Sequence, residues 1–223
     1  MPTALVIGAS RGLGLGLVRE LAGRGWAVTG TVRSAADRAA VEAAGASAAI
    51  ADITDPVAVA ALPAARLDLL FINAGVSGPA HQDAGQATAD EVGALFLTNA
   101  LAPVTAARIL LDRIAPGGVL AFMTSRMGSV AGNDRGDMEL YRASKAALNS
   151  LTRSMVAKLA PEKLGGPLTV LSLHPGWVRT DMGGSGADLD VETSVRGLVD
   201  VILARRGTPG SAFLDYSGAE LPW

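Results

Sequence analysis

The sequence contains no cysteine and only two histidines, His81 and His174, among its 223 residues. Without cysteine there are no disulfide bonds, no thiolate metal ligands and no cysteine nucleophile, and two histidines are too few for a multi-histidine metal centre. Aromatic residues make up 4% of the chain, and its formal net charge is −2. Because nucleic acids and anionic membranes attract basic or base-stacking surfaces, we expect no metal site, no nucleic-acid partner and no membrane partner.

Long hydrophobic runs are also missing. No continuous apolar stretch approaches the roughly 20 residues that span a bilayer, and the N-terminus enters a strand-like run without the charged segment of a signal peptide. Hydrophobic residues nevertheless make up 49% of the chain and charged residues 18%, which is typical of a well-packed globular protein. At this length we expect one domain spanning residues 1–223, located in the cytoplasm.

Short β-type runs alternate with longer stretches rich in alanine and leucine, which is the pattern of parallel βαβ units. The expected strands lie at residues 3–7, 27–32, 47–51, 67–73, 119–124, 168–173 and 211–214, and the main helices at 13–22, 35–44, 88–113, 140–159 and 191–203. Pro103 falls inside the longest helix and predicts a kink or a local break there. The pattern predicts a single α/β domain with a doubly wound (Rossmann-type) parallel sheet of seven strands and helices on both faces.

A glycine-rich turn separates the first expected strand from the first expected helix. Glycines there allow a tight turn and let the backbone approach a pyrophosphate, which the free N–H groups and dipole of the helix N-terminus attract. The spacing is G-x-x-x-G-x-G rather than the G-x-G-x-x-G of ordinary Rossmann dehydrogenases, and a glycine turn without a ligand is the alternative. The residues that we assign to cofactor binding here are Gly8, Ser10, Arg11, Gly12, Leu13 and Gly14.

The end of the second expected strand carries Arg33 and no acidic residue. Folds that bind NAD usually place an Asp or Glu there for the ribose hydroxyls, whereas guanidinium groups suit a 2′-phosphate. Arg33 together with Arg11 therefore favours NADP(H) over NAD(H), and a plain surface charge is the alternative for Arg33. Asp52, at the end of the third strand, and the next residue Ile53 are assigned to the adenine side, although an aspartate that only starts a loop would look the same.

Tyr141 and Lys145 are four residues apart in an expected helix, so their side chains share one face. A free phenol, with a pKa of about 10, is a weak acid at neutral pH, and a neighbouring ammonium group lowers its pKa. The pair could therefore exchange a proton with a carbonyl oxygen near pH 7. On its own, the same spacing also describes a core tyrosine above a solvated lysine.

The order and spacing of these motifs resemble the short-chain dehydrogenase/reductase family almost from end to end. That family has an N-A-G motif after the fourth strand, a P-G motif after the sixth, and a following threonine that helps to hold the nicotinamide carboxamide. The resemblance implies further cofactor-binding residues, namely Asn73, Ala74, Gly75, Pro175, Gly176, Val178 and Thr180.

The same resemblance implies a catalytic set made of Asn99, Ser125, Tyr141 and Lys145. Tyr141 would donate a proton to a substrate carbonyl oxygen that Ser125 also hydrogen-bonds. Lys145 would lower the pKa of Tyr141 and bind the nicotinamide ribose, so Tyr141 and Lys145 count as cofactor-binding residues too. Asn99 would position a water molecule that links Lys145 to solvent.

Residues 125–129, 141–149, 174–184 and 215–223 resemble the C-factor- and sniffer-type carbonyl reductases. The resemblance implies an NADPH-dependent oxidoreductase that reversibly reduces a small carbonyl compound to an alcohol. A dinucleotide-binding signalling or regulatory protein with little turnover is the alternative, and an epimerase or dehydratase would need a longer C-terminal substrate region. Family members commonly pair through two long helices, here 88–113 and 140–159, so a homodimer or homotetramer is expected.

Three single residues near these motifs have two interpretations each. His174 invites a catalytic interpretation, but its place at a strand end favours a structural role. His81 lies in a loop beside the expected cleft, where surface exposure is the default and substrate contact the minor option. Trp177 would either wall the nicotinamide pocket or pack beneath it.

Two segments and three methionines flank the expected substrate side. The glycine-rich segment 182–191 is expected to be mobile and is a candidate lid, and the polar segment 133–138 would form an excursion at the substrate mouth. Either an adaptable apolar lining or core filling would explain Met127, Met138 and Met182.

Overall fold

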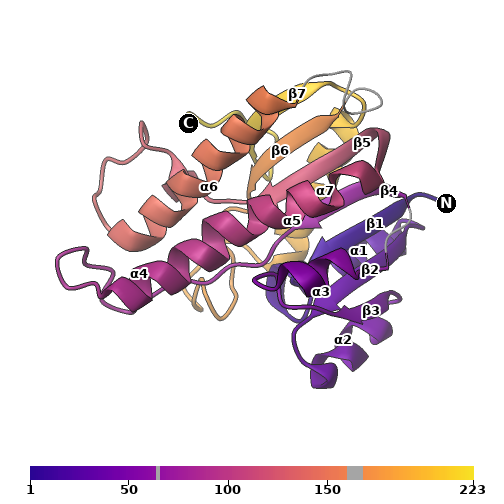
Figure 1. Ribbon diagram of the computed structural model, residues 1–223, viewed down its shortest axis with the longest axis horizontal. Helices are drawn as coiled ribbons and strands as arrows, with labels where there is room; N and C mark the ends of the chain where they lie inside the picture. Colours follow the sequence, from indigo (N-terminus) through magenta and orange to yellow (C-terminus); the bar gives the residue numbers. More distant parts are fainter. Residues whose placement is uncertain (64–65, 160–167) are drawn as a thin grey trace.

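The computed structural model describes residues 1–63, 66–159 and 168–223. Seven parallel strands form one sheet in the order β3-β2-β1-β4-β5-β6-β7. They are β1 (Thr3–Ile7), β2 (Ala27–Val32), β3 (Ser47–Ile50), β4 (Leu67–Ile72), β5 (Ile114–Met123), β6 (Thr169–His174) and β7 (Gly210–Asp215). Helices lie on both faces of this sheet (Figure 1), which confirms the predicted doubly wound architecture.

The helices divide between the two faces of the sheet. One face carries α1 (Gly12–Gly23), α2 (Arg38–Ala43) and α7 (Val191–Arg205), which share one hydrophobic cluster with the strands. The other face carries α3 (Pro56–Ala60), α5 (Ala102–Leu110) and α6 (Glu139–Lys158), which share a second cluster. The helix α4 (Ala89–Phe96) runs on into α5 and extends beyond the sheet (Figure 1).

Alternation along the strands explains the two clusters. In β1, Ala4 and Val6 point into the cluster with α1 and α7, whereas Leu5 and Ile7 point into the cluster with α5 and α6. Successive side chains of a strand face opposite sides of a sheet, and a parallel sheet covered on both faces needs apolar residues on both. The continuous apolar runs in the sequence predicted these strands for this reason.

The order in which the chain adds strands to the sheet reverses between β1 and β4, because β2 and β3 lie on one side of β1 and the remaining strands lie on the other. In such sheets a ligand cleft forms outside the carboxyl ends of the strands at this reversal. The turns after these strands meet there: Ala9 N–H donates to the Thr31 carbonyl oxygen at 2.8 Å, and Asn73 N–H donates to the Ile7 carbonyl oxygen at 2.9 Å.

The helix predicted for residues 88–113 is interrupted. After α4, a π-helical turn covers Leu97–Leu101, and α5 starts at Ala102. Pro103 lies in the first turn of α5, where its missing N–H costs nothing, so the change in helix geometry falls just ahead of it. The predicted break is confirmed, and it places Asn99 in the π-helical turn.

Two further elements differ from the sequence prediction. β5 begins at Ile114 rather than at residue 119, because the pairing with β4 shifts between Leu67 and Leu69 and accommodates a bulge at residues 115–118. The short helix α3 was not predicted, although Asp55 caps it and Pro56 starts it. An Asp-Pro pair is a helix-start signal, but five residues are too few to show a helical period.

The helical stretch Ala89–Arg113 is long and apolar enough to cross a membrane by length and composition. Polar residues such as Asn99 and Arg108 interrupt the apolar run, so this helix is apolar on average although no continuous apolar stretch in it has that length. Half of the tested window is buried inside the protein. Core helices pass the same length and composition test, so the finding is weak evidence for a membrane span.

Candidate active site

A cleft of about 360 Å³ opens at the carboxyl ends of β1, β2 and β4. Its walls come from the glycine turn before α1, the segment after β4, the first half of α6 and the segment after β6. The residues assigned to a site from the sequence that line it are Gly8, Ser10, Arg11, Gly12, Leu13, Arg33, Asp52, Ile53, Asn73, Ala74, Gly75, Tyr141, Lys145, Pro175 and Thr180.

The other assigned residues, Gly14, Asn99, Ser125, Gly176 and Val178, lie outside this lining. Close packing explains the two glycines: a Cβ on Gly14 would lie 2.0 Å from the Gly8 carbonyl oxygen, and a Cβ on Gly176 would lie 2.4 Å from Leu189 Cδ1. Val178 is buried and pairs with Leu189 in an isolated bridge. In this structure these three residues support the walls of the cleft.

The glycine turn is held against the segment that follows β4. Gly8 has φ +89°, and a Cβ on it would lie 2.8 Å from backbone atoms of Ala74. Asn73 Nδ2 donates a hydrogen bond of 2.7 Å to the Gly8 carbonyl oxygen. The helix α1 starts at Gly12, and the preceding Arg11 provides no side-chain cap, so the first N–H groups of α1 stay available to a ligand.

These features fit a dinucleotide. A Cβ on Gly12 would lie 3.5 Å from Thr180 Cγ2, so a side chain there would fill the gap between the glycine turn and the segment after β6. An uncapped helix N-terminus attracts phosphate through its N–H groups and its positive dipole end. Arg33 adds a guanidinium group at the end of β2, within the same lining.

Two charged residues of the cleft, Asp52 and Arg11, are already engaged in contacts within the protein. Asp52 accepts hydrogen bonds from the N–H group and the hydroxyl of Thr54, at 2.8 and 2.7 Å. These bonds, with a smaller effect from the charge of Arg33, lower the pKa of Asp52. Arg11 forms an exposed ion pair with Asp181, and both Arg11 and Arg33 line the cleft, so the anion-binding role of the two arginines stays a prediction.

α6 places Tyr141 and Lys145 one turn apart, and both line the cleft. Lys145 Nζ lies 5.8 Å from the centre of the Tyr141 ring. Its hydrogen bond goes to the Met123 carbonyl oxygen, at 3.0 Å. The amine is therefore anchored to the end of β5 and faces the phenol without contacting its hydroxyl directly.

Burial controls the protonation of this pair. It raises the pKa of Tyr141 to about 12, against which a hydrogen bond with Ser125 acts in the lowering direction. Burial also lowers the pKa of Lys145 to about 8. Burial dominates the pKa of Tyr141 in this structure, so the net shift is upward, opposite to the lowering expected from a neighbouring ammonium group alone.

Ser125 follows the end of β5 and is buried. Its Oγ accepts a hydrogen bond of 3.1 Å from Met127 N–H, and the same side chain acts on the pKa of Tyr141 in the lowering direction. The Ser125 side chain and the Tyr141 phenol are therefore neighbours, although they come from different elements. One carbonyl oxygen placed there could accept a hydrogen bond from each.

Asn99 is fully buried in the π-helical turn. Its Oδ1 accepts from Val76 N–H at 2.8 Å, and its Nδ2 donates to the Val76 carbonyl oxygen at 2.8 Å and to Ser144 Oγ at 3.0 Å. These bonds tie the segment after β4 to α6. A Cβ on Gly75 would lie 3.3 Å from Asn99 Oδ1 and 3.4 Å from Lys145 Nζ, so both groups border the same small space.

The structure adds polar residues that the sequence did not single out. Asn149 accepts from Thr124 Oγ1 at 2.8 Å and donates to the Gly128 carbonyl oxygen at 3.2 Å, which clamps the segment around Ser125 onto α6. Asn149 could have been found, because it repeats the spacing of Tyr141 and Lys145 once more along the helix. Gln82, which binds the backbone of Tyr141, has no such signal.

Neither histidine lines the cleft among the residues that the structure describes. His174 is buried, and burial together with the charge of Arg126 lowers its pKa to about 4, so it is neutral at physiological pH. His81 lies in the loop after β4, where its Nδ1 accepts from Asp83 N–H at 3.0 Å and its Nε2 lies 3.5 Å from Glu91 Oε1.

The segment after β6 is tied down by its own hydrogen bonds. Trp177 Nε1 donates to the Gly183 carbonyl oxygen at 2.8 Å, and Arg179 Nη1 donates to the Ala187 carbonyl oxygen at 2.9 Å. Trp177 is 55% exposed and is not among the residues that line the cleft, so it neither packs beneath the pocket nor forms its wall in this structure. Met182 lines the cleft, and the mobility of segment 182–191 stays a prediction.

The polar segment 133–138 lies on the surface before α6. Gly136 N–H donates to Asn133 Oδ1 at 3.2 Å, and Asp137 forms an ion pair with the buried Arg142. Met138 closes the segment in a left-handed conformation, with φ +53°, and Met127 lies in the turn after Ser125. A polar surface segment is present, but neither its residues nor Met127 are among those that line the cleft, so its place at the substrate mouth stays a prediction.

Comparison with known proteins gives a consistent result. The model of the short chain dehydrogenase family matches residues 2–188. C-signal of Myxococcus xanthus is 44% identical over 159 residues, which cover 70% of this chain and 93% of C-signal. A short-chain dehydrogenase/reductase of Burkholderia multivorans with bound NADP is 39% identical, with a TM-score of 0.92 over 100% of this chain and 99% of that one.

A carbonyl reductase of Pseudomonas aeruginosa in complex with NADP is 42% identical, with a TM-score of 0.89 over the whole of both chains. The likeness to C-signal and to a carbonyl reductase confirms the subgroup that the sequence motifs predicted. The strand order agrees with the fold of these solved structures. The chain belongs to the short-chain dehydrogenase/reductase family and is an oxidoreductase of the carbonyl-reductase-like kind.

Proposed function

We propose that this protein is an NADPH-dependent reductase that converts a small aldehyde or ketone into an alcohol, and that the reaction is reversible. The observation that carries this proposal is the placement of Tyr141 and Lys145, one helical turn apart and with Ser125 acting on the phenol, in a cleft that fits a dinucleotide. Arg33 supports NADP(H) over NAD(H), because a guanidinium group suits a 2′-phosphate. The relatives with bound NADP support the same choice.

NADPH, when bound in the cleft, supplies the hydride. Tyr141 then has to supply a proton to the carbonyl oxygen, and its raised pKa of about 12 keeps the phenol protonated at neutral pH. Ser125 Oγ accepts from Met127 N–H, and its own hydroxyl hydrogen can donate to the same carbonyl oxygen once that oxygen takes the place of the Tyr141 phenol as acceptor. Two preorganised donors at one oxygen stabilise the negative charge that develops there.

Lys145 prepares Tyr141 to give up its proton. With a pKa of about 8, the amine is mostly protonated near neutral pH, and its positive charge favours the phenolate that forms as the proton leaves. Proton resupply would pass through the space beside Gly75, which Lys145 Nζ and Asn99 Oδ1 both border. A water molecule between these two groups would give Asn99 the relay role that its position in the family implies.

The region between Thr180 and α7 favours a small substrate. It spans only residues 181–190, and Trp177 and Met182 are more than half exposed. So short a segment leaves no room for a separate substrate domain. A small apolar aldehyde, ketone or quinone is the substrate class that suits this open, partly apolar mouth.

Absorbance of NADPH gives the direct test. The purified protein is mixed with NADPH and a panel of aldehydes, ketones and quinones, and oxidation with at least one class is expected, faster than with NADH at equal concentration. Tight binding of NADPH without turnover on any member of the panel would contradict the reductase function.

A second function has one observation in its favour, the 44% identity to C-signal. We infer from it a dinucleotide-binding signalling protein in which NADP(H) binding, rather than turnover, is the output. The same panel separates the two functions, because the signalling function predicts NADPH binding with turnover near background for every carbonyl compound.

We also propose a homodimer or homotetramer. Leu97 and Leu101, in the π-helical turn between α4 and α5, are 44% and 51% exposed. Exposed large apolar side chains one turn apart suit a contact with a second copy. Light scattering after size exclusion should give a mass of two or four chains, and a monomer at micromolar concentration would contradict this proposal.

A further inference from the structure

The loop between β4 and α4 packs against the start of α6 and contains an unusual glutamine. Gln82 is 8% exposed, although glutamine is normally a surface residue. Its backbone is left-handed, with φ +57°, a conformation that glycine and asparagine adopt far more readily. A buried amide in a strained backbone persists only where surrounding contacts enforce it.

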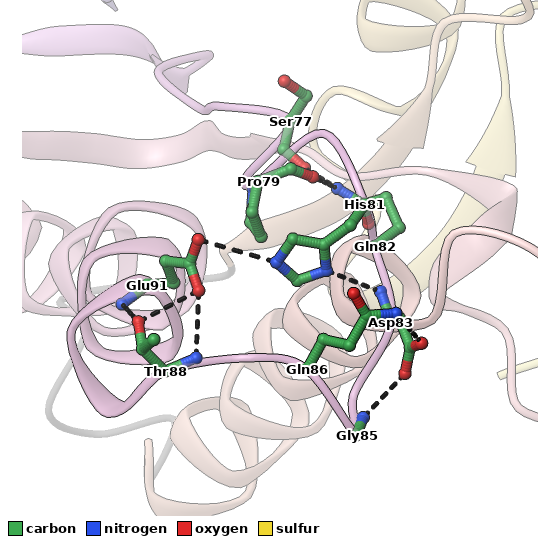
Figure 2. Close-up of polar contacts among 9 residues, drawn as sticks. All are labelled: Ser77, Pro79, His81, Gln82, Asp83, Gly85, Gln86, Thr88 and Glu91. Atoms are coloured by element: carbon green, nitrogen blue, oxygen red, sulfur yellow. Dashed lines mark hydrogen bonds and ion pairs between the residues drawn. The ribbon is translucent and has the colours of Figure 1, made fainter.

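Those contacts use both ends of the Gln82 amide. Its Oε1 accepts a hydrogen bond of 2.9 Å from the backbone N–H group of Tyr141. Its Nε2 donates to the carbonyl oxygens of Ser77 and Pro79, at 2.8 and 2.7 Å (Figure 2). One side chain therefore joins the loop after β4 to the helix that carries the proposed proton donor.

The start of α6 needs this partner. The first N–H groups of a helix have no partner within the helix, and a side chain just before it usually supplies one. Met138, the residue before α6, offers no side-chain cap. In α4, by contrast, Thr88 caps its own helix locally through a reciprocal pair with Glu91 (Figure 2).

We propose that Gln82 is a positioning residue for the reaction: it caps α6 from a loop 59 residues away and thereby fixes where the Tyr141 hydroxyl meets Ser125. The inference rests on the proposed reductase function. Tyr141 is the third residue of α6, so its backbone position is set directly by the first turn. Hydride transfer is sensitive to displacements of about 1 Å, which cost up to about 100-fold in rate.

The loop is built to hold Gln82 in place. Ala84 N–H donates to Glu139 Oε2 at 2.9 Å, which makes a second link from the loop to the first turn of α6. Asp83 accepts from Gly85 N–H at 2.8 Å, and His81 bridges from Asp83 N–H to Glu91 on α4. Figure 2 shows the His81 side chain between Asp83 and Glu91, where it joins the loop to α4.

Three variants test the proposal. Gln82→Leu removes both the acceptor and the donors, whereas Gln82→Glu keeps an acceptor for Tyr141 N–H beside a helix N-terminus, where negative charge is favoured. Gln86→Leu is the matched control, because Gln86 is an exposed glutamine of the same loop whose amide bonds only to Asp83. For each variant we would measure kcat, the NADPH dissociation constant and the kinetic isotope effect with NADPH deuterated at the transferred position.

The expected result is a drop in kcat of at least about tenfold for Gln82→Leu, with NADPH affinity within twofold and a larger isotope effect. Gln82→Glu keeps the acceptor for Tyr141 N–H but loses the donors to Ser77 and Pro79, so its loss in kcat should be smaller than that of Gln82→Leu, and Gln86→Leu should match the wild type. The isotope effect separates this result from partial unfolding of Gln82→Leu, because a smaller fraction of folded enzyme would lower the apparent kcat without changing the isotope effect. Unchanged kcat in Gln82→Leu, an unchanged isotope effect, or an equal loss in Gln82→Glu would each overturn the proposal.

Hydrogen exchange separates this inference from the proposed function. The amide of Tyr141 should exchange faster in Gln82→Leu than in the wild type, more slowly in Gln82→Glu than in Gln82→Leu, and at the wild-type rate in Gln86→Leu. Unaltered exchange at Tyr141 in Gln82→Leu would overturn the capping role whatever the protein catalyses. If Gln82→Leu alters the exchange but the protein has no reductase activity, the capping role of Gln82 stands and only its link to carbonyl reduction is lost.

Discussion

Lys145 Nζ donates a hydrogen bond to the Met123 carbonyl oxygen at 3.0 Å, so the amine of α6 is anchored to the last residue of β5. This contact orients the ammonium group toward the sheet, 5.8 Å from the centre of the Tyr141 ring. Burial lowers the pKa of Lys145 to about 8 and raises that of Tyr141 to about 12. Near neutral pH both groups hold their protons, which is the state that carbonyl reduction requires.

The lowered pKa of Lys145 predicts a pH-dependent stability. The folded state disfavours the ammonium form, so this penalty is complete below about pH 8 and is relieved as the pH rises toward the ordinary lysine value of 10.5. The free energy of unfolding of the wild type, minus that of Lys145→Met, should therefore increase by about 1 kcal/mol or more between pH 8 and pH 10. Denaturant unfolding at several pH values measures this difference, and parallel curves for the two proteins would contradict it.

Gly8 should not tolerate a side chain. With φ +89° and Ala74 backbone atoms 2.8 Å from a built Cβ, Gly8→Ala should lose about 1–3 kcal/mol of stability and weaken NADPH binding. Gly93→Ala is the control, because Gly93 lies in α4 with no atom near its Cβ position, and this change should stabilise the protein by about 0.5–1 kcal/mol. Thermal unfolding and cofactor titration measure both effects, and equal behaviour of the two variants would refute the proposed packing of the turn.

Arg33 should determine the cofactor preference. A hydrogen bond to a charged partner contributes about 1.5–3 kcal/mol, which corresponds to roughly 10–100-fold in affinity. Arg33→Ala should therefore weaken NADPH binding by that factor and leave NADH binding within about twofold. Fluorescence titration with both cofactors gives the two dissociation constants, and an equal loss for both would show that Arg33 does not contact the 2′-phosphate.

Most of the features predicted correctly from the sequence depend on patterns among residues that are close together in the chain. The apolar runs around Leu5 and Leu70 identify strands buried on both faces, and the glycines at 8 and 12 mark a turn whose backbone must approach other groups closely. Tyr141 and Lys145 share a helix face because of their spacing. These features depend on residues that are near one another in the chain, so the sequence states them directly.

Long-range contacts account for what the sequence missed. Gln82 acts on Tyr141 across 59 residues, and no periodicity or motif connects the two. Burial raises the pKa of Tyr141 and lowers that of Lys145, and Lys145 is bound to the Met123 carbonyl oxygen. The four-residue spacing of the pair gives no information about burial or about that contact. Likewise, the pairing of Arg11 with Asp181 appears only when the glycine turn and the segment after β6 are placed together.

Tyr141→Phe is the most direct test of the proposed reaction. The variant keeps the ring in the cleft and removes only the hydroxyl that meets Ser125, and general acid catalysis is typically worth about 10²–10⁴ in rate. Measured with the best carbonyl substrate of the panel, kcat should fall at least about 100-fold while the NADPH dissociation constant stays within twofold. A variant that reduces the substrate at close to the wild-type rate would show that Tyr141 is not the proton donor.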